Sequence, residues 1–417
     1  MAIDRRSFIG MAGAVAIAPV LHGQAWAQAA EAELRPMTGN AVPIGAAERQ
    51  GRIERAQKSM REAGLSAILI EPGASLVYFT GVRWGRSERL TGAVIPATGQ
   101  IGVFTPFFEE PSVRESLAVP ADLRTWNEHE DPLQLVARWL GEKKLASGTI
   151  GVEETVRYFA VDGLQRALPG ARIRSAAPVV RALRMIKSPA EIALMQLAAD
   201  ITVAAYRYTA PRIQRGMSPA DIGAIMNGAT AKLGGRPEFA LVLLGEASAY
   251  PHGTGKPQAV KEGEVVLMDC GCTVEGYQSD ISRTFVFGDP TRRQREVWNQ
   301  MHRGQRIAFE AARLGAAAGS VDDAVRGFYR TLGYGPDYKL PGLPHRTGHG
   351  IGLEGHEPVN LVRGEKTLLA PGMCFSDEPG IYIPGQFGIR LEDCFYMTPS
   401  GPRWFSTPPP SLDRPFG

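Results

Sequence analysis

The sequence predicts an α+β protein of two domains, in which an N-terminal α/β domain precedes a C-terminal domain of helices packed on antiparallel strands. At 417 residues the chain is longer than one hydrophobic core usually organises. Helix-like and strand-like segments alternate over residues 48–180, whereas over residues 181–417 helices are followed by paired strands, twice in succession. The two patterns indicate two domains of different architecture.

The composition is that of an ordinary globular protein. Hydrophobic residues make up 44% of the chain, charged residues make up 21%, and the formal net charge is +3. This weak charge is not gathered into blocks, so nucleic acid is not expected as a partner. The four cysteines are too few for a disulfide framework and are expected to be small core residues: Cys270, Cys272, Cys374 and Cys394.

Residues 1–27 have the plan of an export signal. Arg5-Arg6 precedes an apolar stretch over residues 9–21, and Ala25-Trp26-Ala27 supplies the small residues that a signal peptidase reads. The apolar stretch is too short to span a bilayer. We therefore expect a twin-arginine signal peptide that directs the folded protein to the periplasm or another extracytoplasmic compartment, with no stable membrane anchor.

The N-terminal domain is expected to follow a short connecting segment. Residues 28–47 are rich in alanine, proline and glycine, which predicts a flexible lead-in. Residues 48–180 show no cluster of metal ligands and no glycine-rich phosphate loop, so we expect the chemistry elsewhere. The expected helices of this domain are 52–63, 132–145 and 161–168, and the expected strands are 66–70, 92–95, 101–104 and 149–152.

The C-terminal domain, residues 181–417, opens with a helix-start signature. Ser188-Pro189-Ala190-Glu191 is a capping box with proline at the first helical position, and Ser218-Pro219-Ala220-Asp221 repeats it with aspartate. The repeated order of helices and strand pairs suggests two related halves packing helices on one antiparallel sheet. We expect a further helix at 292–313, strands at 264–269, 278–286, 373–379 and 389–397, and an extended proline-rich tail at 408–417.

Asp269 and Asp280 stand on either side of a predicted hairpin. With the turn centred on Val274-Glu275, the two residues would lie directly opposite each other, with Cβ atoms about 5 Å apart. Two buried carboxylates at that separation repel each other, and one of them takes up a proton unless a cation lies between them. The pair therefore predicts a metal site, with a solvated pair of aspartates beside a turn as the plainer alternative.

Glu378 and Glu392 repeat this arrangement. A turn around Pro384-Gly385-Gln386 would place them opposite each other on a second hairpin. A solvated acidic pair accounts for one such hairpin but not for two in the same domain. The second pair therefore strengthens the prediction of a metal site.

Three of the seven histidines fall within residues 345–356, a run with four glycines. Glycine lets backbone and ligand approach closely. Four carboxylates and an imidazole suit Mn²⁺, Co²⁺, Fe²⁺ or Zn²⁺, and so many anionic groups exceed what one dication needs. We expect two divalent ions, with Mn²⁺ as the expected species and Co²⁺, Zn²⁺ or Fe²⁺ as alternatives, held by Asp269, Asp280, His349, Glu378 and Glu392.

These motifs resemble those of the pita-bread metallopeptidases (family M24), which include aminopeptidase P, prolidase, methionine aminopeptidase and the metal-free creatinase. The ligand order Asp, Asp, His, Glu, Glu is similar to the family pattern over about residues 180–400. The resemblance implies a pita-bread catalytic domain behind an N-terminal creatinase-like domain. The segments nearest to the prolidase and aminopeptidase P branch are 279–285, 378–382 and 390–393.

The resemblance also implies a reaction and a role for each matching residue. The enzyme would hydrolyse the Xaa-Pro imide bond of dipeptides or short proline-containing peptides, by attack of a metal-bridging water with Glu378 as general base. His252 would steady the developing oxyanion, and His356 would assist proton transfer, because the leaving nitrogen of an imide must be protonated. The substrate pocket would be lined by His345, Arg390 and Tyr382.

Some alternatives stay open at this point. One ligand set serves both a prolidase, which takes dipeptides, and an aminopeptidase P, which takes longer peptides. A non-peptidase relative of lyase or amidinohydrolase type would also share it. A methionine aminopeptidase is disfavoured, because such enzymes usually lack the extra N-terminal domain. A binding module descended from the enzyme is disfavoured too, because no ligand is lost.

Particular residues also have more than one interpretation. Arg390 either anchors a substrate carboxylate bidentately or supports Glu392. Arg346 departs from the commoner versions of the family motif, so we expect an unusual pocket rim. Relatives imply a homodimer, in which Trp84 or Arg86 either reaches the neighbouring subunit's pocket or stays in a local surface loop.

Overall fold

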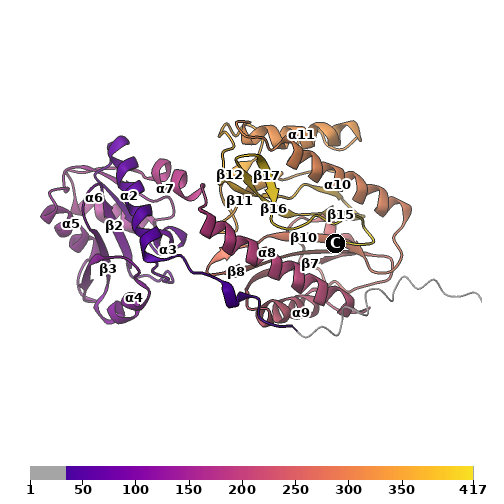
Figure 1. Cartoon of the computed structure of the whole chain (residues 1–417), viewed down its shortest axis with the longest axis horizontal. Helices are drawn as coiled ribbons and strands as arrows, with labels where there is room; N and C mark the ends of the chain where they lie inside the picture. The colour runs from indigo at the N-terminus through magenta and orange to yellow at the C-terminus, as the bar shows by residue number, and fades with distance from the viewer. Residues whose placement is uncertain (1–33, 417) are drawn as a thin grey trace, which may run out of the picture.

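The chain forms two domains that lie side by side along the long axis of the molecule (Figure 1). The computed structural model describes residues 34–416, so the predicted signal peptide, residues 1–27, lies outside the described residues. Within the described range, no helix combines the length and the apolar character that crossing a membrane requires. The predicted two-domain α+β architecture is confirmed.

The N-terminal domain is a mixed six-stranded sheet with helices around it, in the strand order β4-β3-β2-β1-β5-β6. The two outer strands were not predicted, because they lie at the sheet edges, β4 partly exposed and β6 mostly exposed, and lack an apolar run. The strands are β1 (Ala67–Ile70), β2 (Gly92–Pro96), β3 (Ile101–Pro106), β4 (Ala121–Trp126), β5 (Thr149–Val152) and β6 (Arg172–Ser175). The helices are α2 (Ala46–Glu62), α3 (Ala74–Thr80), α4 (Glu110–Ser116), α5 (Pro132–Glu142), α6 (Tyr158–Ala167) and α7 (Ala177–Arg184).

The C-terminal domain consists of two helix pairs and two main sheets, and every strand pair described in it is antiparallel. Both predicted capping boxes are present, at Ser188 and at Ser218. The helices are α8 (Pro189–Thr209), α9 (Pro219–Lys232), α10 (Arg292–Ala311) and α11 (Ala318–Thr331). The first sheet holds β7 (Arg236–Leu244), β8 (Val265–Val274), β9 (Tyr277–Gln278) and β10 (Ile281–Val286).

The second sheet has the order β12-β11-β13-β16-β17, and a separate hairpin, β14–β15, interrupts it in sequence. The prediction of one antiparallel sheet was therefore wrong, because the strands of this domain form two main sheets and a separate hairpin. The two main sheets are joined where Ser282 and Glu392 exchange backbone hydrogen bonds of 3.2 and 3.1 Å. The strands are β11 (Gly348–Gly350), β12 (Glu357–Leu361), β13 (Cys374–Asp377), β14 (Gly380–Ile383), β15 (Phe387–Arg390), β16 (Asp393–Thr398) and β17 (Gly401–Trp404).

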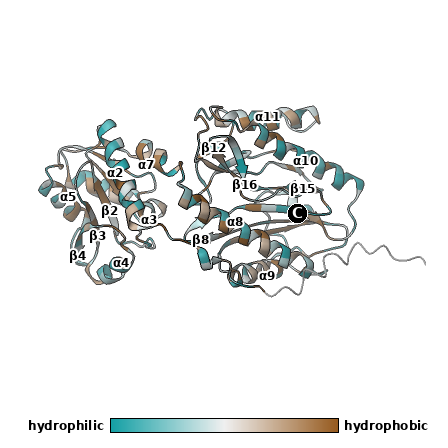
Figure 2. Cartoon of the chain, viewed as in Figure 1, coloured by the Kyte–Doolittle hydropathy of each residue, from teal (hydrophilic) through white to brown (hydrophobic). Residues whose placement is uncertain are grey.

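Each helix pair covers one half of the domain over its own apolar core. Helices α8 and α9 pack on β7 and β8, whereas α10 and α11 lie on the opposite side, over β12 to β15 (Figure 1). In Figure 2 helix α10 carries hydrophilic and hydrophobic residues in turn, as an amphipathic helix does. The strands that carry the predicted metal ligands therefore lie between two layers of helices.

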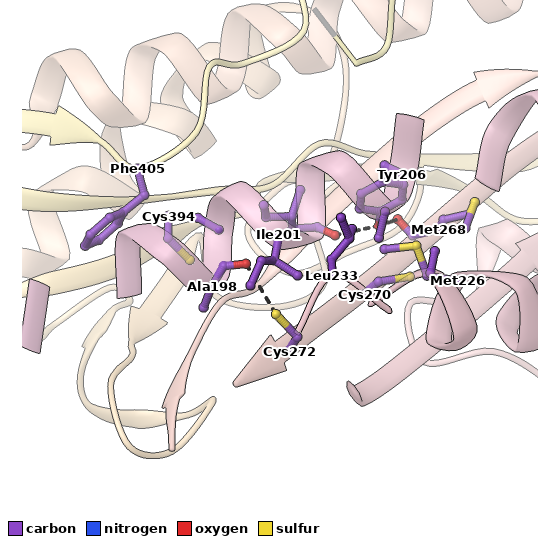
Figure 3. Close-up of a cluster of buried hydrophobic side chains, with 14 of the residues drawn as sticks. Ala198, Ile201, Tyr206, Met226, Leu233, Met268, Cys270, Cys272, Cys394 and Phe405 are labelled. Atoms are coloured by element: carbon purple, nitrogen blue, oxygen red, sulfur yellow. Dashed lines mark hydrogen bonds between the residues drawn. The ribbon is translucent and has the colours of Figure 1, made fainter. Parts of the chain in front are cut away.

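The four cysteines are free and buried, as predicted. Figure 3 shows Cys270 and Cys272 on β8 beneath helix α8, among Ile201, Leu233 and Met268. The thiol of Cys272 donates to the carbonyl of Ala198 over 3.3 Å. All four cysteines are part of this hydrophobic core.

Both chain ends of the described region differ from the prediction. The lead-in is packed rather than free from residue 34 on, because Met37 N donates to Leu233 O over 2.8 Å beside a short 3-10 helix, η2 (Thr38–Asn40). The tail is not extended, since it turns back and buries Leu412 and Phe416. Apolar side chains of each segment pack into the cores of the C-terminal domain.

Candidate metal centre

Five side chains converge between the two sheets, and we call them the ligand set: Asp269, Asp280, His349, Glu378 and Glu392. Asp269 lies on β8 and His349 on β11, whereas the other three lie where a strand is interrupted. Two groups of their ligand atoms each fit within 4.8 Å, Asp269 with Asp280 and Glu392, and His349 with Glu378 and Glu392. A third group of the same size joins Asp280 and His349 to His356, which lies outside the ligand set. The sequence-predicted ligands are therefore together in space.

The register of the first hairpin differs from the prediction. Val274 pairs with Tyr277, so the turn is Glu275-Gly276 rather than Val274-Glu275, and Asp269 is opposite Ser282 instead of Asp280. Glu275 and Gly276 both have positive φ, 52° and 87°, which is the conformation of a type I′ hairpin turn. The slip is two residues, so both aspartates still point to one face, as diagonal neighbours.

The register of the second hairpin agrees with the prediction. Ile383 pairs with Phe387 around Gly385, and the strand pair beyond the interruption continues the same register with Asp377 opposite Asp393. Glu378 and Glu392 fall between these two ladders and face each other. Gly385 has a φ of 74°, which suits a three-residue loop with glycine in the left-handed position.

His349 presents one defined nitrogen to the carboxylates. Its Nδ1 lies 3.0 Å from Gly350 O, so Nδ1 carries the proton and Nε2 carries the lone pair. Nε2 lies 3.3 Å from Glu378 Oε1 and 3.6 Å from Asp280 Oδ2. A Cβ on Gly348 would lie 2.1 Å from Ser376 O, so only glycine allows this strand to approach its neighbour.

The charges of the ligand set are only partly compensated without a metal ion, because Arg390 is the one basic side chain paired with its four carboxylates in the described residues. Burial, followed by the neighbouring carboxylates, raises the pKa of Asp280 and of Glu392 well above the usual range. Burial raises the pKa of Glu378 to about 7, although the charge of Arg390 opposes it. Three buried oxygens have no hydrogen-bond partner among the described residues: Asp269 Oδ1, Asp280 Oδ1 and Glu392 Oε1. Free oxygens and an imidazole lone pair that converge on one space fit divalent cations.

Arg390 supports the ligand set directly. Its Nη2 lies 2.6 Å from Asp269 Oδ2, and its Nε donates to Ser282 Oγ over 2.9 Å. Ser282 Oγ in turn donates to Glu392 Oε2 over 2.8 Å. Nη1 donates to Tyr382 OH and to Pro251 O, so four of the five N–H donors are in use. The geometry favours the supporting role for Arg390 and leaves no bidentate face for a substrate carboxylate.

His345 and Tyr382 are placed differently from each other. His345 lines the cleft, but Tyr382 is fully buried behind it and does not. Tyr382 OH lies 2.9 Å from His345 Nε2, and Arg346 O lies 2.8 Å from His345 Nδ1. Burial lowers the pKa of His345 to about 3, so the ring is neutral and both nitrogens are engaged. Tyr382 thus holds His345 and Arg390 in place instead of touching a substrate.

The cleft has a volume of about 880 Å³, and the whole ligand set lines it. His252 and His356 also line it, and both are exposed. The ring of His356 stands edge-to-face against His349, with centroids 4.2 Å apart. The part of the His356 ring that is shielded from water, and then the charge of Arg346, lower the pKa of His356. The structure therefore brings His252, predicted to steady the oxyanion, and His356, predicted to assist proton transfer, to the same cavity as the ligand set.

Sequence reasoning missed the groups that hold this cleft in shape. Arg326 on α11 donates to Leu343 O over 2.8 Å and to His345 O, and Thr347 Oγ1 donates to Asp322 over 2.7 Å. Helix α11 was not expected, so its buried Asp322–Arg326 pair was not singled out. The i, i+4 spacing of an acidic and a basic residue was the available signal.

Comparisons with known proteins agree with this geometry. The profile described as metallopeptidase family M24 matches residues 193–399, and the creatinase/prolidase N-terminal domain matches residues 52–186. The probable dipeptidase PepE of Mycobacterium tuberculosis is 35% identical, over 84% of this chain and 92% of the relative. The Xaa-Pro dipeptidase of Pyrococcus furiosus is 29% identical, over 84% of this chain and 96% of the relative. The crystal structure of dipeptidase PepE from Mycobacterium ulcerans superposes with a TM-score of 0.81 at 33% identity, over 89% of this chain and 99% of that one.

The fold and the acidic cleft together define a two-domain metallopeptidase with a pita-bread catalytic domain. The chain belongs to metallopeptidase family M24 and carries the creatinase/prolidase type of N-terminal domain.

Proposed function

We propose that this enzyme hydrolyses the imide bond between an N-terminal residue and proline in dipeptides or short peptides. Two divalent metal ions, with Mn²⁺ expected, would be held by the ligand set. The convergence of its five side chains on one cleft supports this most directly. The relatives named dipeptidase and Xaa-Pro dipeptidase support the substrate class.

Divalent ions bound there would polarise the scissile carbonyl and lower the pKa of water. Glu378 would accept the proton of the attacking water, because its carboxylate lies in the ligand set, beside the space where the ions and that water would be held. His252 would donate a hydrogen bond to the oxygen that gains negative charge. His356 would deliver a proton to the proline nitrogen, which has no hydrogen of its own.

One assay separates the candidate activities. The mature chain is purified, its metal content is measured, and Ala-Pro, Gly-Pro and a longer Xaa-Pro-Xaa peptide are offered with and without Mn²⁺. Cleavage of dipeptides alone indicates a prolidase, and cleavage of the longer peptide indicates an aminopeptidase P. Full metal content without cleavage of any peptide contradicts the proposal and favours a non-peptidase relative.

We also propose export and dimerisation, which have separate tests. Replacing Arg5-Arg6 with Lys-Lys is expected to keep the protein inside the cell, because the twin arginine addresses the route that carries folded proteins. Fractionation with immunodetection measures this, and unchanged export contradicts it. Light scattering of the mature chain is expected to give twice the monomer mass, and a monomer would contradict the dimer.

A further inference from the structure

Arg346 lines the cleft without a partner for its side chain. It lies three positions before His349 and is half-buried. Its guanidinium makes no hydrogen bond or ion pair with any residue in the described range 34–416. Its backbone is fixed, because its carbonyl accepts from His345 Nδ1 and the next amide donates to Leu361 O over 3.1 Å. The cleft therefore holds a positioned cation whose donors are free.

The second basic side chain that lines the cleft is already engaged. Arg390 uses four of its five donors on Ser282, Pro251, Tyr382 and Asp269. It is 2% exposed, so a ligand has almost no access to it. Among the arginines of the cleft in the described residues, Arg346 is the one whose guanidinium is both accessible and unengaged.

The charges around Arg346 favour an anion. Two divalent ions would neutralise the four carboxylates of the ligand set. The two further acidic residues of the cleft have cations of their own, because Glu238 lies 3.2 Å from Arg236 and Glu354 lies 2.7 Å from Arg184. Arg346 and the buried Arg390 then leave the cleft with excess positive charge, of which Arg346 is the accessible part, and a cleft with low-dielectric walls concentrates the field of such a charge.

We propose that Arg346 binds a carboxylate of the substrate and thereby sets the specificity of the enzyme. This inference rests on the proposed function. A planar guanidinium matches a carboxylate with two parallel hydrogen bonds. A dipeptide has its α-carboxylate on the residue after the scissile bond, whereas a longer peptide carries it farther away. An acidic side chain on the first residue is the other source of the same group.

The test compares substrates that differ only in that carboxylate. The metal-loaded enzyme and its Arg346→Gln variant are assayed with Ala-Pro and Ala-Pro amide, and with Glu-Pro and Gln-Pro. Arg346→Gln is expected to lower kcat/KM for Ala-Pro by roughly 10- to 100-fold, mainly through KM, and to leave the amide unchanged. Arg346→Lys is expected to restore part of the loss. Arg303→Gln, on the exposed side of α10, is the matched control and is expected to have no effect.

Each outcome bears on the assignment. A fall confined to Glu-Pro relative to Gln-Pro also supports it and identifies the acidic side chain as the ligand. Unchanged ratios for both pairs, in an enzyme that cleaves dipeptides, overturn it and leave the proposed function standing. If the metal-loaded wild type cleaves nothing, calorimetry with L-proline and L-prolinamide decides. If the wild type binds L-proline more tightly than L-prolinamide and Arg346→Gln does not, carboxylate binding is supported. If the two proteins bind L-proline equally tightly, the assignment is overturned.

Discussion

Asp280 occupies a position that is unfavourable for an ionised carboxylate. Its side chain is buried, one carboxylate oxygen has no partner among the described residues, and neighbouring carboxylates add their charge. An isolated carboxylate in such a place takes up a proton, because ionisation without a counter-charge is costly. A divalent cation removes that cost, so the residue is arranged for binding and not for the stability of the metal-free protein.

Asp280→Ala is therefore expected to abolish peptide hydrolysis and to reduce the metal content, without lowering the stability of the metal-free protein. Peptide assays, elemental analysis and thermal unfolding in EDTA measure the three effects. Asp323→Ala removes an exposed aspartate and serves as the control. Wild-type activity in Asp280→Ala would remove Asp280 from the ligand set.

Ser282 is expected to matter through the two charged groups that it joins. Ser282→Ala would leave Arg390 Nε and Glu392 Oε2 buried without that partner, which costs about 1–3 kcal/mol of stability. Loss of an outer-shell partner also weakens metal affinity by about 10-fold or more. Urea unfolding and metal titration measure these effects, and the exposed Ser320→Ala on α11 is the control. Unchanged affinity would show that Ser282 does not orient Glu392.

At the scale of residues, the sequence predicted which charged side chains form the ligand set but not which side chains contact one another around it. The ligand set could be predicted because two acidic pairs flanking turns in one domain are hard to accommodate without cations. The burial of Tyr382 and the use of Arg390 donors could not, because both depend on which side chains from β8, β10 and β14 meet. Resemblance assigned Tyr382 to the substrate, whereas its hydroxyl contacts His345 and Arg390.

At the scale of elements, the residues of each turn determined whether the strand register of its hairpin could be predicted. Around Gly385 the loop and the register were both predicted, because glycine marks the centre of the three-residue loop. Around Gly276 the centre was misplaced by one residue, since a type I′ turn puts glycine at its second central position. Side chains on a strand alternate between faces with a period of two residues, so the two-residue register slip left both carboxylates on the predicted face.

The loop before β12 is anchored by a buried ion-pair cluster with a predictable pH response. Glu357 lies 2.9 Å from Lys187 Nζ and 2.6 Å from Arg184 Nη2. Burial alone would raise the pKa of Glu357, but Lys187 and Arg184 outweigh it and lower the pKa to about 2. The folded pKa is below the unfolded one, so the cluster stabilises the fold above pH ~4.5 and this stabilisation is lost as pH falls toward ~2.

Glu357→Gln is expected to lower the stability at pH 7 by about 3–5 kcal/mol, because it leaves two buried cations uncompensated. Between pH ~4.5 and ~2 the variant is also expected to lose less unfolding free energy than the wild type, by on the order of 3 kcal/mol, because it lacks the group that titrates there. Urea unfolding at pH 7, 4.5 and 3 measures both, with the exposed Glu310→Gln on α10 as control. An acid response equal to that of the wild type would contradict the lowered pKa.

At the scale of the whole molecule, the two domains are joined by a buried polar contact beside the first hairpin. Arg52 of α2 lies 3.2 Å from Glu191 of α8 and donates to Tyr277 OH over 3.2 Å. Tyr277 OH in turn donates to Glu191 over 2.8 Å. The two-domain plan was predictable from the sequence, but this contact was not, because its members are 225 residues apart.

Removal of metal is expected to destabilise the whole chain and to change its proton content. Each ion at 100 times its dissociation constant stabilises the folded state by about 2.7 kcal/mol, so EDTA is expected to lower Tm and Mn²⁺ to restore it. Because Asp280, Glu378 and Glu392 have raised pKa values without metal, binding is expected to release protons and to strengthen as pH rises. Calorimetry in buffers of different ionisation enthalpy measures the release. A Tm indifferent to both reagents would contradict the site.

The most direct measurement is anomalous diffraction at the manganese edge from crystals of the mature chain grown with Mn²⁺. Two strong peaks among Asp269, Asp280, His349, Glu378 and Glu392 are predicted. An empty space between those side chains, in crystals that contain Mn²⁺ elsewhere or not at all, would contradict the account.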